Sequence, residues 1–428
     1  MASARPLFSI VMPTRNRAQF LHYSLQSALE QSFDNYEIVV SDNNSSDDTP
    51  QVVRELANGR VRYVRSDQPL SNPDSSEFAL THARGEYIIF LADDDAMCPD
   101  LLEKVAEVGM ERQARVITWE RAFYFHGRMS EPDHTNTLEL CPFTQQVVDV
   151  DSESSLRRLY AADWNHGFPA LVDAAYHCDV IKRVTARNTR FFYTIPLDIS
   201  SCLAVLTQVD KYAYIRDSMV VYGKHDGNTV LSAYRPESNE RQESDFAANR
   251  FEHVPLRSSL LLNYTFETLL KMKQVMPAEL KEYEVDWAAY FMSCHDDLMI
   301  LQEHGADVYP EIQEFFAALD RQPTEFQLWV RSAIVQLGVQ KAAPSFRFRK
   351  WLERSSLLGQ LELALRPSHR QSKNLRIRGD KVGFGNIVEC ARFLNHGLRK
   401  ELARFWTGQR WSLPVEAEVL SENPWRVV

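Results

Sequence analysis

The stretch GEYIIFLADDD, residues 85–95, decides the fold, because an apolar run there ends directly on three aspartates. Such a run, opened by Gly85 and closed by charges, is typical of a buried strand. Similar runs occur through the first hundred residues, and they alternate with segments such as 17–31 whose apolar side chains recur at helical spacing. Strands that alternate with helices at this pitch predict parallel βαβ units. We therefore expect an α/β fold with a mainly parallel sheet flanked by helices.

Polar clusters follow three of the predicted strands, at 14–17, 41–48 and 93–95. In a parallel sheet, ligands bind in the crevice beyond the carboxyl ends of the strands. We therefore expect these three clusters to meet at one end of the sheet. The strands of this first part are expected at residues 7–12, 36–40, 61–64 and 86–92.

Asp93, Asp94 and Asp95 stand side by side directly after the fourth predicted strand. Adjacent carboxylates repel one another, which raises the pKa of at least one of them unless a cation is present. Mn²⁺ and Mg²⁺ accept oxygen ligands, and Mg²⁺ commonly combines one or two carboxylates with substrate phosphates. The pattern favours a site in which the protein holds one side of a divalent cation and a diphosphate holds the other. The simpler alternative is a solvated acidic turn that caps the next helix.

Composition excludes several classes of protein. With 48 basic and 58 acidic side chains the formal net charge is −10, which disfavours a nucleic-acid partner. The six cysteines form no CxxC pair, which excludes a disulfide-dense scaffold and the usual structural zinc spacings. No stretch approaches the ~18 consecutive apolar residues of a membrane span, and the N-terminus lacks the pattern of a signal peptide. We expect a cytoplasmic location, with a peripheral contact at the inner face of the membrane.

The sequence pattern changes at about residue 240. Helical periodicity dominates from there on, so we expect an α/β domain at 1–240 and a mostly α-helical domain at 241–428, with a linker near Ala233–Asp245. Within the second domain, 341–381 carries a net charge of +8. This segment suits an anionic membrane surface or a lipid-linked acceptor. Alternatively, it is a solvated basic face or the contact to a partner subunit in an oligomer.

Three segments together resemble glycosyltransferase family 2, whose members have the GT-A fold. They are FSIVMPTRNR at 8–17, YEIVVSDNNSSD at 36–47 and GEYIIFLADDD at 85–95, in the family's order and spacing. The resemblance is close over 6–105, loose over 106–230 and absent beyond. It implies a Rossmann-like, mixed, mainly parallel sheet and an inverting, metal-dependent transfer of a sugar from a nucleotide-diphosphate donor, usually a UDP sugar. The acceptor would be a hydroxyl of a saccharide or lipid-linked saccharide, in the synthesis of a surface polysaccharide or glycoconjugate.

The resemblance also implies roles for residues at matching positions. Asp42 would accept a hydrogen bond from the base, and Asp93 would contact the ribose or uridine side. Ala92 stands where the family frequently has Asp, so the acidic signature is shifted by one residue. Alternatively, Asp42 is an Asx-turn residue that ends a strand. The alternative for Thr14 and Arg17 is a helix cap and a surface charge. The remaining implied residues are Pro13, Thr14 and Arg17 for the nucleotide pocket, and Asp94 and Asp95 for Mn²⁺ or Mg²⁺.

A catalytic base is expected in the second half of the α/β domain. The resemblance implies a carboxylate that takes the proton from the acceptor hydroxyl, a contribution of typically ~10²–10⁴-fold. Asp198 follows Pro196 and precedes an apolar helix expected at 197–209, and we assign it this role. Asp173 is the competing candidate. Asp198 also fits an ordinary first-turn aspartate, favoured by the helix dipole.

Four more residues are candidates for metal or substrate contacts. The segment YGKHDGNT, 222–229, resembles the strand and histidine near the end of many GT-A domains. His225 would complete the metal shell or contact the diphosphate, and Lys224 would neutralise phosphate charge; a loop histidine and a surface lysine are the alternatives. Trp164 is a candidate wall for the acceptor sugar, or a core residue. Glu77 lies where the family often carries an Arg-Asn pair, and we expect it to act in donor or acceptor choice unless it is a solvated helix residue.

Two other functions fit parts of this pattern. A GT-A nucleotidyltransferase would need a glycine-rich, basic loop after the first strand, and PTRNR at 13–17 contains no glycine. A non-catalytic sugar-nucleotide-binding or scaffold protein would keep the fold and bind UDP without needing Asp198. A dehydrogenase is disfavoured because no GxGxxG follows the first strand.

Overall fold

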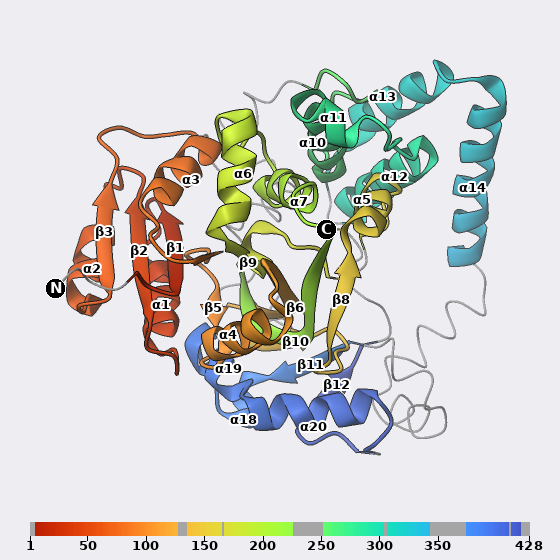
Figure 1. Ribbon diagram of the computed structural model, residues 1–428. Helices are drawn as coiled ribbons and strands as arrows, with labels where there is room; N and C mark the ends of the chain where they lie inside the picture. Colours follow the sequence, from red (N-terminus) through yellow and green to blue (C-terminus); the bar gives the residue numbers. More distant parts are fainter. Residues whose placement is uncertain are drawn as a thin grey trace.

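The computed structural model describes residues 5–126, 135–164, 167–225, 251–303, 306–342, 374–410 and 412–420. These residues form one mixed sheet of 12 strands, with helices packed against it and a further group of helices beyond (Figure 1). The predicted α/β class is confirmed.

The chain begins with parallel βαβ units, as predicted. In order they are β1 (Phe8–Thr14), α1 (Ala18–Leu29), β2 (Tyr36–Asp42), α2 (Thr49–Leu56), β3 (Val61–Arg65), α3 (Asn72–Thr81) and β4 (Tyr87–Phe90). The four strands lie in the order β3–β2–β1–β4 and are parallel. Side chains alternate along β1, so that Ile10 joins the core with Leu21 and Leu25 of α1, whereas Val11 joins a second core with Ala79 of α3. Helices therefore cover both faces of this part of the sheet.

Beyond β4 the sheet becomes mixed. The elements are β5 (Ala96–Met97), α4 (Leu101–Arg112), β6 (Val116–Phe125), β7 (Thr137–Leu140), β8 (Val147–Asp151), α5 (Ser152–Tyr160), β9 (Ala174–His177), α6 (Cys178–Asn188), α7 (Leu197–Leu206) and β10 (Lys211–Lys224). Strand β9 lies between β4 and β6 and runs antiparallel to both. Strand β10 is parallel to β6 and antiparallel to β5 and β8. This pairing brings the end of β10 back to the residues that follow β4.

The three polar clusters meet at one end of the sheet, as expected. Thr14 at the end of β1 is paired in register with Asp42 at the end of β2. The N–H of Asn43 donates to the carbonyl of Thr14 at 2.8 Å. The N–H of Leu91 donates to the carbonyl of Val11 at 2.9 Å, which places the residues after β4 beside the end of β1.

A layer of helices follows residue 250, and the predicted helical region is confirmed. It contains α10 (Leu261–Val275), α11 (Pro277–Leu280), α12 (Trp287–Glu303), α13 (Tyr309–Asp320) and α14 (Thr324–Ala342). Its core is continuous with that of α5, α6 and α7. The hydroxyl of Thr268 on α10 donates to the carbonyl of Ile195, just before α7, at 3.0 Å. Figure 1 shows this layer above β10 and β8, on the side of α7.

The last described residues return to the sheet, which helical periodicity did not indicate. They form β11 (Leu375–Arg378), α18 (Gly379–Val382), α19 (Ile387–Phe393), α20 (His396–Trp406) and β12 (Glu418–Val419). Strand β11 is antiparallel to β7, and β12 is antiparallel to β11. The predicted boundary and linker near residue 240 fall in residues 226–250, outside the described ranges, and the division into 1–240 and 241–428 stays a prediction. Most of the basic segment 341–381 is likewise outside them.

Among the described residues, no helix combines the length and the apolar character that a membrane crossing requires.

Candidate functional site

The acidic triplet lies in the turn between β4 and β5, and all three carboxylates are buried. Asp93, Asp94 and Asp95 are between 3 and 7% exposed. The hydroxyl of Thr14 donates to Oδ2 of Asp93 at 2.7 Å. Nη1 of Arg17 lies 2.8 Å from Oδ1 of Asp93 and 3.2 Å from Oδ2 of Asp94. The triplet is therefore not the solvated turn of the simpler alternative, and two predicted nucleotide-pocket residues contact it.

His225, at the end of β10, reaches the same cluster. Its Nε2 lies 3.0 Å from Oδ2 of Asp94 and 3.3 Å from Nη2 of Arg17. Phe20 of α1 stacks on the imidazole with ring centroids 4.1 Å apart, and the Arg17 guanidinium lies 5.7 Å from the same phenyl ring. The structure thus brings together residues that are far apart in the chain and that the sequence assigned to one metal and diphosphate site.

Gly223 allows β10 to approach the triplet this closely. Its N–H donates to Oδ1 of Asp95 at 2.9 Å. A Cβ at position 223 would lie only 1.9 Å from the backbone oxygen of Asp94, which no side chain can occupy. A glycine is therefore required here for the strand and the acidic turn to pack together.

The charges in the triplet are unevenly compensated. Burial raises the pKa of Asp95 well above its usual value, and the neighbouring charge of Asp94 adds to the effect. Burial also raises the pKa of Asp93, against the opposing charge of Arg17. For Asp94, burial acts in the same direction but Arg17 and His225 outweigh it, so its pKa is lowered. One carboxylate is thus held ionised by cationic neighbours, while ionisation of the others would be favoured by further positive charge.

The donor set suits a hard divalent cation. Asp94 and Asp95 offer carboxylate oxygens and His225 offers an imidazole nitrogen, which are ligand types accepted by Mn²⁺ and, for the oxygens, by Mg²⁺. In this structure Asp94 and His225 present adjacent donor atoms, whereas Oδ1 of Asp95 is directed to the N–H of Gly223. These residues therefore have the ligand chemistry that a cation needs. Asp94 and His225 are the two whose donor atoms already lie side by side.

A second group of ligand-type side chains lies elsewhere. Among the described residues, His177, Cys178 and Asp179 place one ligand atom each within 4.8 Å of one another. Nη1 of Arg115 lies 3.2 Å from Nδ1 of His177 and 3.0 Å from Oδ2 of Asp179, and Arg5 donates to the Cys178 sulfur at 2.9 Å. Two guanidinium groups already contact this cluster, so its geometry does not indicate a metal site.

Asp42 is completely buried and engaged within its own end of the sheet. Oδ1 accepts the N–H of Ser45 at 2.7 Å, and Oδ2 accepts the hydroxyl of Tyr63 and lies 3.4 Å from Nη1 of Arg65. The Asx-turn contact that was the alternative is thus present. The role of Asp42 toward a base stays a prediction, as does that of Pro13, which lies opposite Ser41 in the register of β1 and β2.

Asp198 lies in the first turn of α7 and is half-buried. Burial raises its pKa, while the charge of Arg121 and the N–H groups of Leu171 and Val172 act in the opposite direction. A carboxylate with a raised pKa is a stronger proton acceptor than an ordinary aspartate. Its position and chemistry suit the predicted base.

Asp173, the competing candidate, is buried inside the protein. It is 1% exposed, its Oδ2 lies 2.6 Å from Nη2 of Arg121, and its Oδ1 accepts the hydroxyl of Tyr222. Burial raises its pKa to about 6 despite the opposing charge of Arg121. Both of its oxygens are occupied by protein groups, so Asp173 is placed to hold Arg121 rather than to meet a substrate.

The three predicted substrate contacts have different surroundings. The carboxylate of Glu77 accepts the N–H groups of Phe191 and Phe192 at 3.0 Å, so it is not a solvated helix residue. Lys224 is buried, with Nζ 5.2 Å from the centre of the Phe123 ring, and burial lowers its pKa against the charge of Asp95. It is therefore not a surface lysine.

Trp164 is half-buried and packs against the core that α5, α6 and α7 share with the helices after residue 250. Its ring packs edge-on at 6.1 Å from Phe266 of α10. None of the ring contacts described for it involves a predicted site residue. The core alternative therefore describes its surroundings, and an acceptor contact stays a prediction.

Two residues of the site were not predicted from the sequence. Arg121 lies between Asp173 and Asp198, and His126 lies against Phe20 and His225 with ring centroids 5.3 and 5.9 Å away. Both come from β6 or directly follow it. The signal for Arg121 is the charged pair Glu120-Arg121 inside an apolar stretch, a pattern that by itself favours two short strands with a break between them.

Comparison with known proteins identifies related chains. The family model described as glycosyl transferase family 2 matches residues 9–184. The GalNAc(5)-diNAcBac-PP-undecaprenol beta-1,3-glucosyltransferase of Campylobacter jejuni is 35% identical over 189 residues, 44% of this chain and 55% of that protein. The UDP-Glc:alpha-D-GlcNAc-diphosphoundecaprenol beta-1,3-glucosyltransferase WfaP of Escherichia coli is 30% identical over 199 residues, 44% of this chain and 76% of that protein.

Other matches are shorter or more distant. The chain spans 45% of the Bacillus subtilis putative teichuronic acid biosynthesis glycosyltransferase TuaG and 38% of the E. coli glucosyltransferase WfgD. Among solved structures, S. aureus TarS 1-349 in complex with UDP-GlcNAc is 17% identical with a TM-score of 0.42, and the match covers 69% of this chain and 81% of that one. A TM-score this low adds nothing to the fold assignment.

Proposed function

Because the chain belongs to glycosyltransferase family 2, we propose that it transfers a sugar from a UDP-sugar donor to a hydroxyl of a lipid-linked saccharide. The transfer would invert the anomeric carbon and depend on Mn²⁺ or Mg²⁺. The observation that carries this proposal is the buried cluster in which Asp93, Asp94 and Asp95 meet Arg17 and His225 at the carboxyl ends of the strands.

In the proposed site, Asp94, Asp95 and His225 hold the divalent cation. When bound, the cation supplies Lewis-acid stabilisation of the negative charge that develops on the departing diphosphate. Arg17 contacts two of the same carboxylates and retains a side chain that is 26% exposed. It can therefore both neutralise the triplet and face the diphosphate.

The nucleoside part of the donor would bind at the ends of β1 and β2. Pro13, Thr14, Asp42 and Asp93 lie there and are proposed to form its pocket. Support comes from the hydrogen bond between Thr14 and Asp93, which places the residue assigned to the ribose directly beside the first strand. Both carboxylate oxygens of Asp42 already accept hydrogen bonds from the protein, so a base would share an oxygen with the Tyr63 hydroxyl.

Asp198 is proposed as the base that takes the proton from the acceptor hydroxyl. It is half-buried, whereas Asp173 has both oxygens occupied by Arg121 and Tyr222. Arg121 faces both carboxylates, and Lys224 lies close enough for its charge to act on Asp198. These positive charges oppose burial, which nevertheless raises the pKa of Asp198 and makes it a stronger proton acceptor than an ordinary aspartate.

The acceptor class is proposed from the relatives. Three of them carry names that specify undecaprenol-diphosphate-linked substrates. A lipid-linked acceptor would bring this chain to a membrane surface, at which the basic segment 341–381 is proposed to make a peripheral contact on the cytoplasmic side.

A donor screen tests the proposal. The full chain is incubated with a panel of UDP sugars and undecaprenyl-diphosphate-linked sugars in MnCl₂, MgCl₂ or EDTA, and UDP release is measured. We expect release that needs both a metal and an acceptor and that Asp198→Asn abolishes. Metal-independent release, or equal release by Asp198→Asn, would reject the mechanism. Metal-dependent UDP binding without turnover under any combination would favour the non-catalytic sugar-nucleotide-binding alternative.

A further inference from the structure

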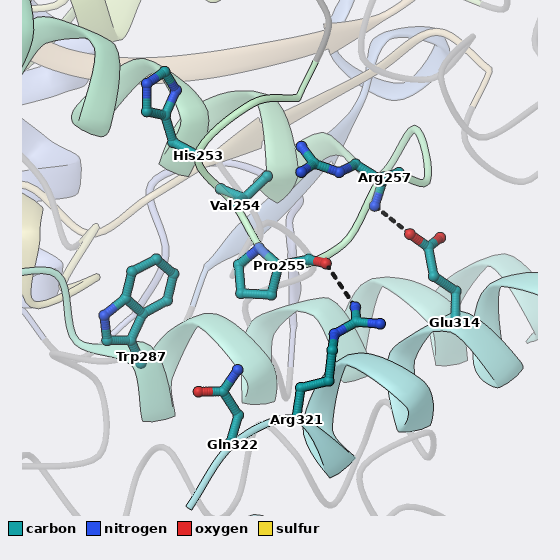
Figure 2. Close-up of a pocket in the computed structure, with 8 residues that line it drawn as sticks. All are labelled: His253, Val254, Pro255, Arg257, Trp287, Glu314, Arg321 and Gln322. Atoms are coloured by element: carbon teal, nitrogen blue, oxygen red, sulfur yellow. Dashed lines mark hydrogen bonds between the residues drawn. The ribbon is translucent and has the colours of Figure 1, made fainter.

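The helical layer contains a cavity of about 880 Å³ that is separate from the acidic cluster. It lies among the loop before α10, the start of α12, and α13 with the turn that follows it (Figure 2). Its volume is in the range of ~300–1,000 Å³ that small-molecule sites occupy. The residues that line it are His253, Val254, Pro255, Arg257, Trp287, Glu314, Arg321 and Gln322.

A buried carboxylate on α10 fixes the first half of the lining loop. Glu267 is 2% exposed and accepts the N–H groups of Glu252, His253 and Val254 at 3.0 to 3.2 Å. It also lies 2.7 Å from Nδ1 of His253. Burial would raise the pKa of Glu267, but the hydrogen bonds from His253 and the backbone outweigh it and lower the pKa. An ionised carboxylate therefore holds this loop in place.

The second half of the loop is held by α13 and the turn after it. Glu314 accepts the N–H of Arg257, and Nη2 of Arg321 donates to the carbonyl of Pro255 at 3.4 Å (Figure 2). Four backbone N–H groups and one carbonyl of the loop are thus bonded to side chains of the helical layer. A loop held in this way loses less entropy when a ligand binds than a mobile loop would.

Two arginines and an indole are among the side chains that line the cavity. Arg257 and Arg321 are both exposed, and the described residues offer the Arg257 guanidinium no hydrogen bond or ion pair. Trp287 is half-buried and packs edge-on against Tyr290 at 5.6 Å. Figure 2 shows the indole on one side of Pro255 and both arginines on the other, with the Arg321 guanidinium below Arg257.

These groups match the parts of a charged sugar. Guanidinium groups bind carboxylate and phosphate with two parallel hydrogen bonds, and a lone arginine without a partner is suited to supply them. An indole gives a flat apolar surface for the face of a pyranose ring. Gln322 and Glu314 add an amide and a carboxylate that can bond sugar hydroxyls. We propose that this cavity binds an anionic sugar unit, one bearing a carboxylate or a phosphate, within a saccharide chain.

The cavity is connected to the proposed active site through α10. The helix that carries Glu267 also carries Thr268, whose hydroxyl donates to the carbonyl of Ile195, three residues before Asp198. The assignment of this ligand as part of the acceptor rests on the proposed function, whereas the binding itself does not require turnover. An acceptor chain held here would be oriented by the same helical layer that supports the proposed base.

Calorimetric titration of the full chain without donor tests the site. The probes are trigalacturonate, glucose 6-phosphate, the neutral trisaccharide maltotriose and inorganic phosphate. We expect an anionic sugar to bind at least about tenfold more tightly than maltotriose and inorganic phosphate. Preference for trigalacturonate would assign a carboxylate, and preference for glucose 6-phosphate would assign a phosphate.

Variants connect the binding to the cavity. Arg257→Ala removes a guanidinium that makes no hydrogen bond or ion pair with the described residues, so the variant should fold normally. It should weaken binding of the anionic sugar about tenfold or more. Trp287→Ala should also weaken binding of the anionic sugar. Two controls should bind it as tightly as the parent does: Lys281→Ala, which removes an exposed cation outside the cavity, and Asp94→Asn, in the acidic cluster. Four outcomes would overturn the proposal. They are equal binding of neutral and anionic sugars, binding of inorganic phosphate as tight as that of either sugar, unchanged binding by Arg257→Ala, and no binding at all. Loss of turnover in Asp94→Asn with retained saccharide binding would show that the two sites are independent.

Discussion

The backbone nitrogen of Gly223 lies 2.9 Å from Oδ1 of Asp95, so the end of β10 is hydrogen-bonded to the acidic turn 128 residues earlier in the chain. Gly223 precedes Lys224 and His225, and its position therefore determines where these two side chains meet the triplet. Nothing larger than a hydrogen fits at this position, because a Cβ would lie 1.9 Å from the carbonyl oxygen of Asp94.

Gly223→Ala should displace β10 from the acidic turn. We expect a loss of about 1–3 kcal/mol in the free energy of unfolding, typical of an added methyl group in a packed site, and a loss of metal-dependent UDP binding. Urea unfolding and a thermal-shift titration with UDP and MnCl₂ measure the two effects. Gly59→Ala is the matched control, since a Cβ there would meet nothing within 4 Å. A Gly223→Ala variant as stable and as responsive as the parent would contradict the close packing.

Asp94→Asn should abolish the metal-dependent response to UDP. Asp94 is the carboxylate that contacts both Arg17 and His225, and the amide would be a weaker ligand without charge. The increase in Tm on adding UDP with MnCl₂ should disappear. Asp34→Asn, at a carboxylate that is 93% exposed and pairs only with Arg60 among the ion pairs described, should keep the full increase. A retained response in Asp94→Asn would place the cation elsewhere.

Asp198→Asn and Asp173→Asn should fail in different ways. Loss of the proposed base should lower kcat by about 10²–10⁴-fold with UDP affinity and Tm unchanged. Asp173→Asn instead removes the partner of Arg121, so its main effect should be a lower Tm. Measuring both quantities for both variants separates the roles. If Asp173→Asn lost turnover at unchanged Tm while Asp198→Asn kept it, the assignment of the base would be reversed.

The pH profile of transfer should reflect the raised pKa of the half-buried Asp198. Burial raises the pKa of Asp198, and a base acts only when it is deprotonated. Activity should therefore be lost as the pH falls through this raised value, so the acid limb of kcat/KM lies above the ordinary aspartate pKa of about 3.9. Steady-state rates measured across the acid range at saturating MnCl₂ test this. An acid limb at or below the ordinary value would argue against Asp198 as the titrating group.

Glu77 should act as a positioning residue. Its carboxylate accepts the N–H groups of Phe191 and Phe192, in the segment that leads to α7 and Asp198. Glu77→Ala would leave two N–H groups without their partner, at a cost of about 1–3 kcal/mol, and should lower kcat more than it changes KM for the donor. Glu77→Gln, which retains one acceptor oxygen, should recover part of the rate. Glu55→Ala, at an exposed residue of α2, is the control. A purely structural role for Glu77 would lower Tm without changing kcat.

Local patterns were sufficient to predict the first part of the fold. Along β1 and α1 the apolar side chains follow the periods of a strand and a helix, and the structure places each element within two residues of its predicted bounds. The meeting of Thr14, Asp42 and the triplet at one end of the sheet follows from parallel strands alone.

Contacts between distant parts of the chain were not predictable in the same way. Glu120 and Arg121 interrupt an apolar stretch, and only their partners Tyr214 and Asp173 explain why β6 continues through them. Nor does helical periodicity after residue 240 reveal that Arg376 forms an ion pair with Glu139, 237 residues earlier. Such partners are set by the folded sheet, and a single sequence carries no local signal for them.

The pairing of β11 with β7 has a practical consequence for expression of fragments. Glu139 in β7 is 1% exposed, and its charge is matched by Arg376 from the returning strand. A truncated chain that stops near residue 240 would lack Arg376 and would uncover the backbone donors and acceptors along β7. Exposed edge strands pair with strands of other molecules. Such a fragment should therefore aggregate, even though it retains every residue of the proposed catalytic centre.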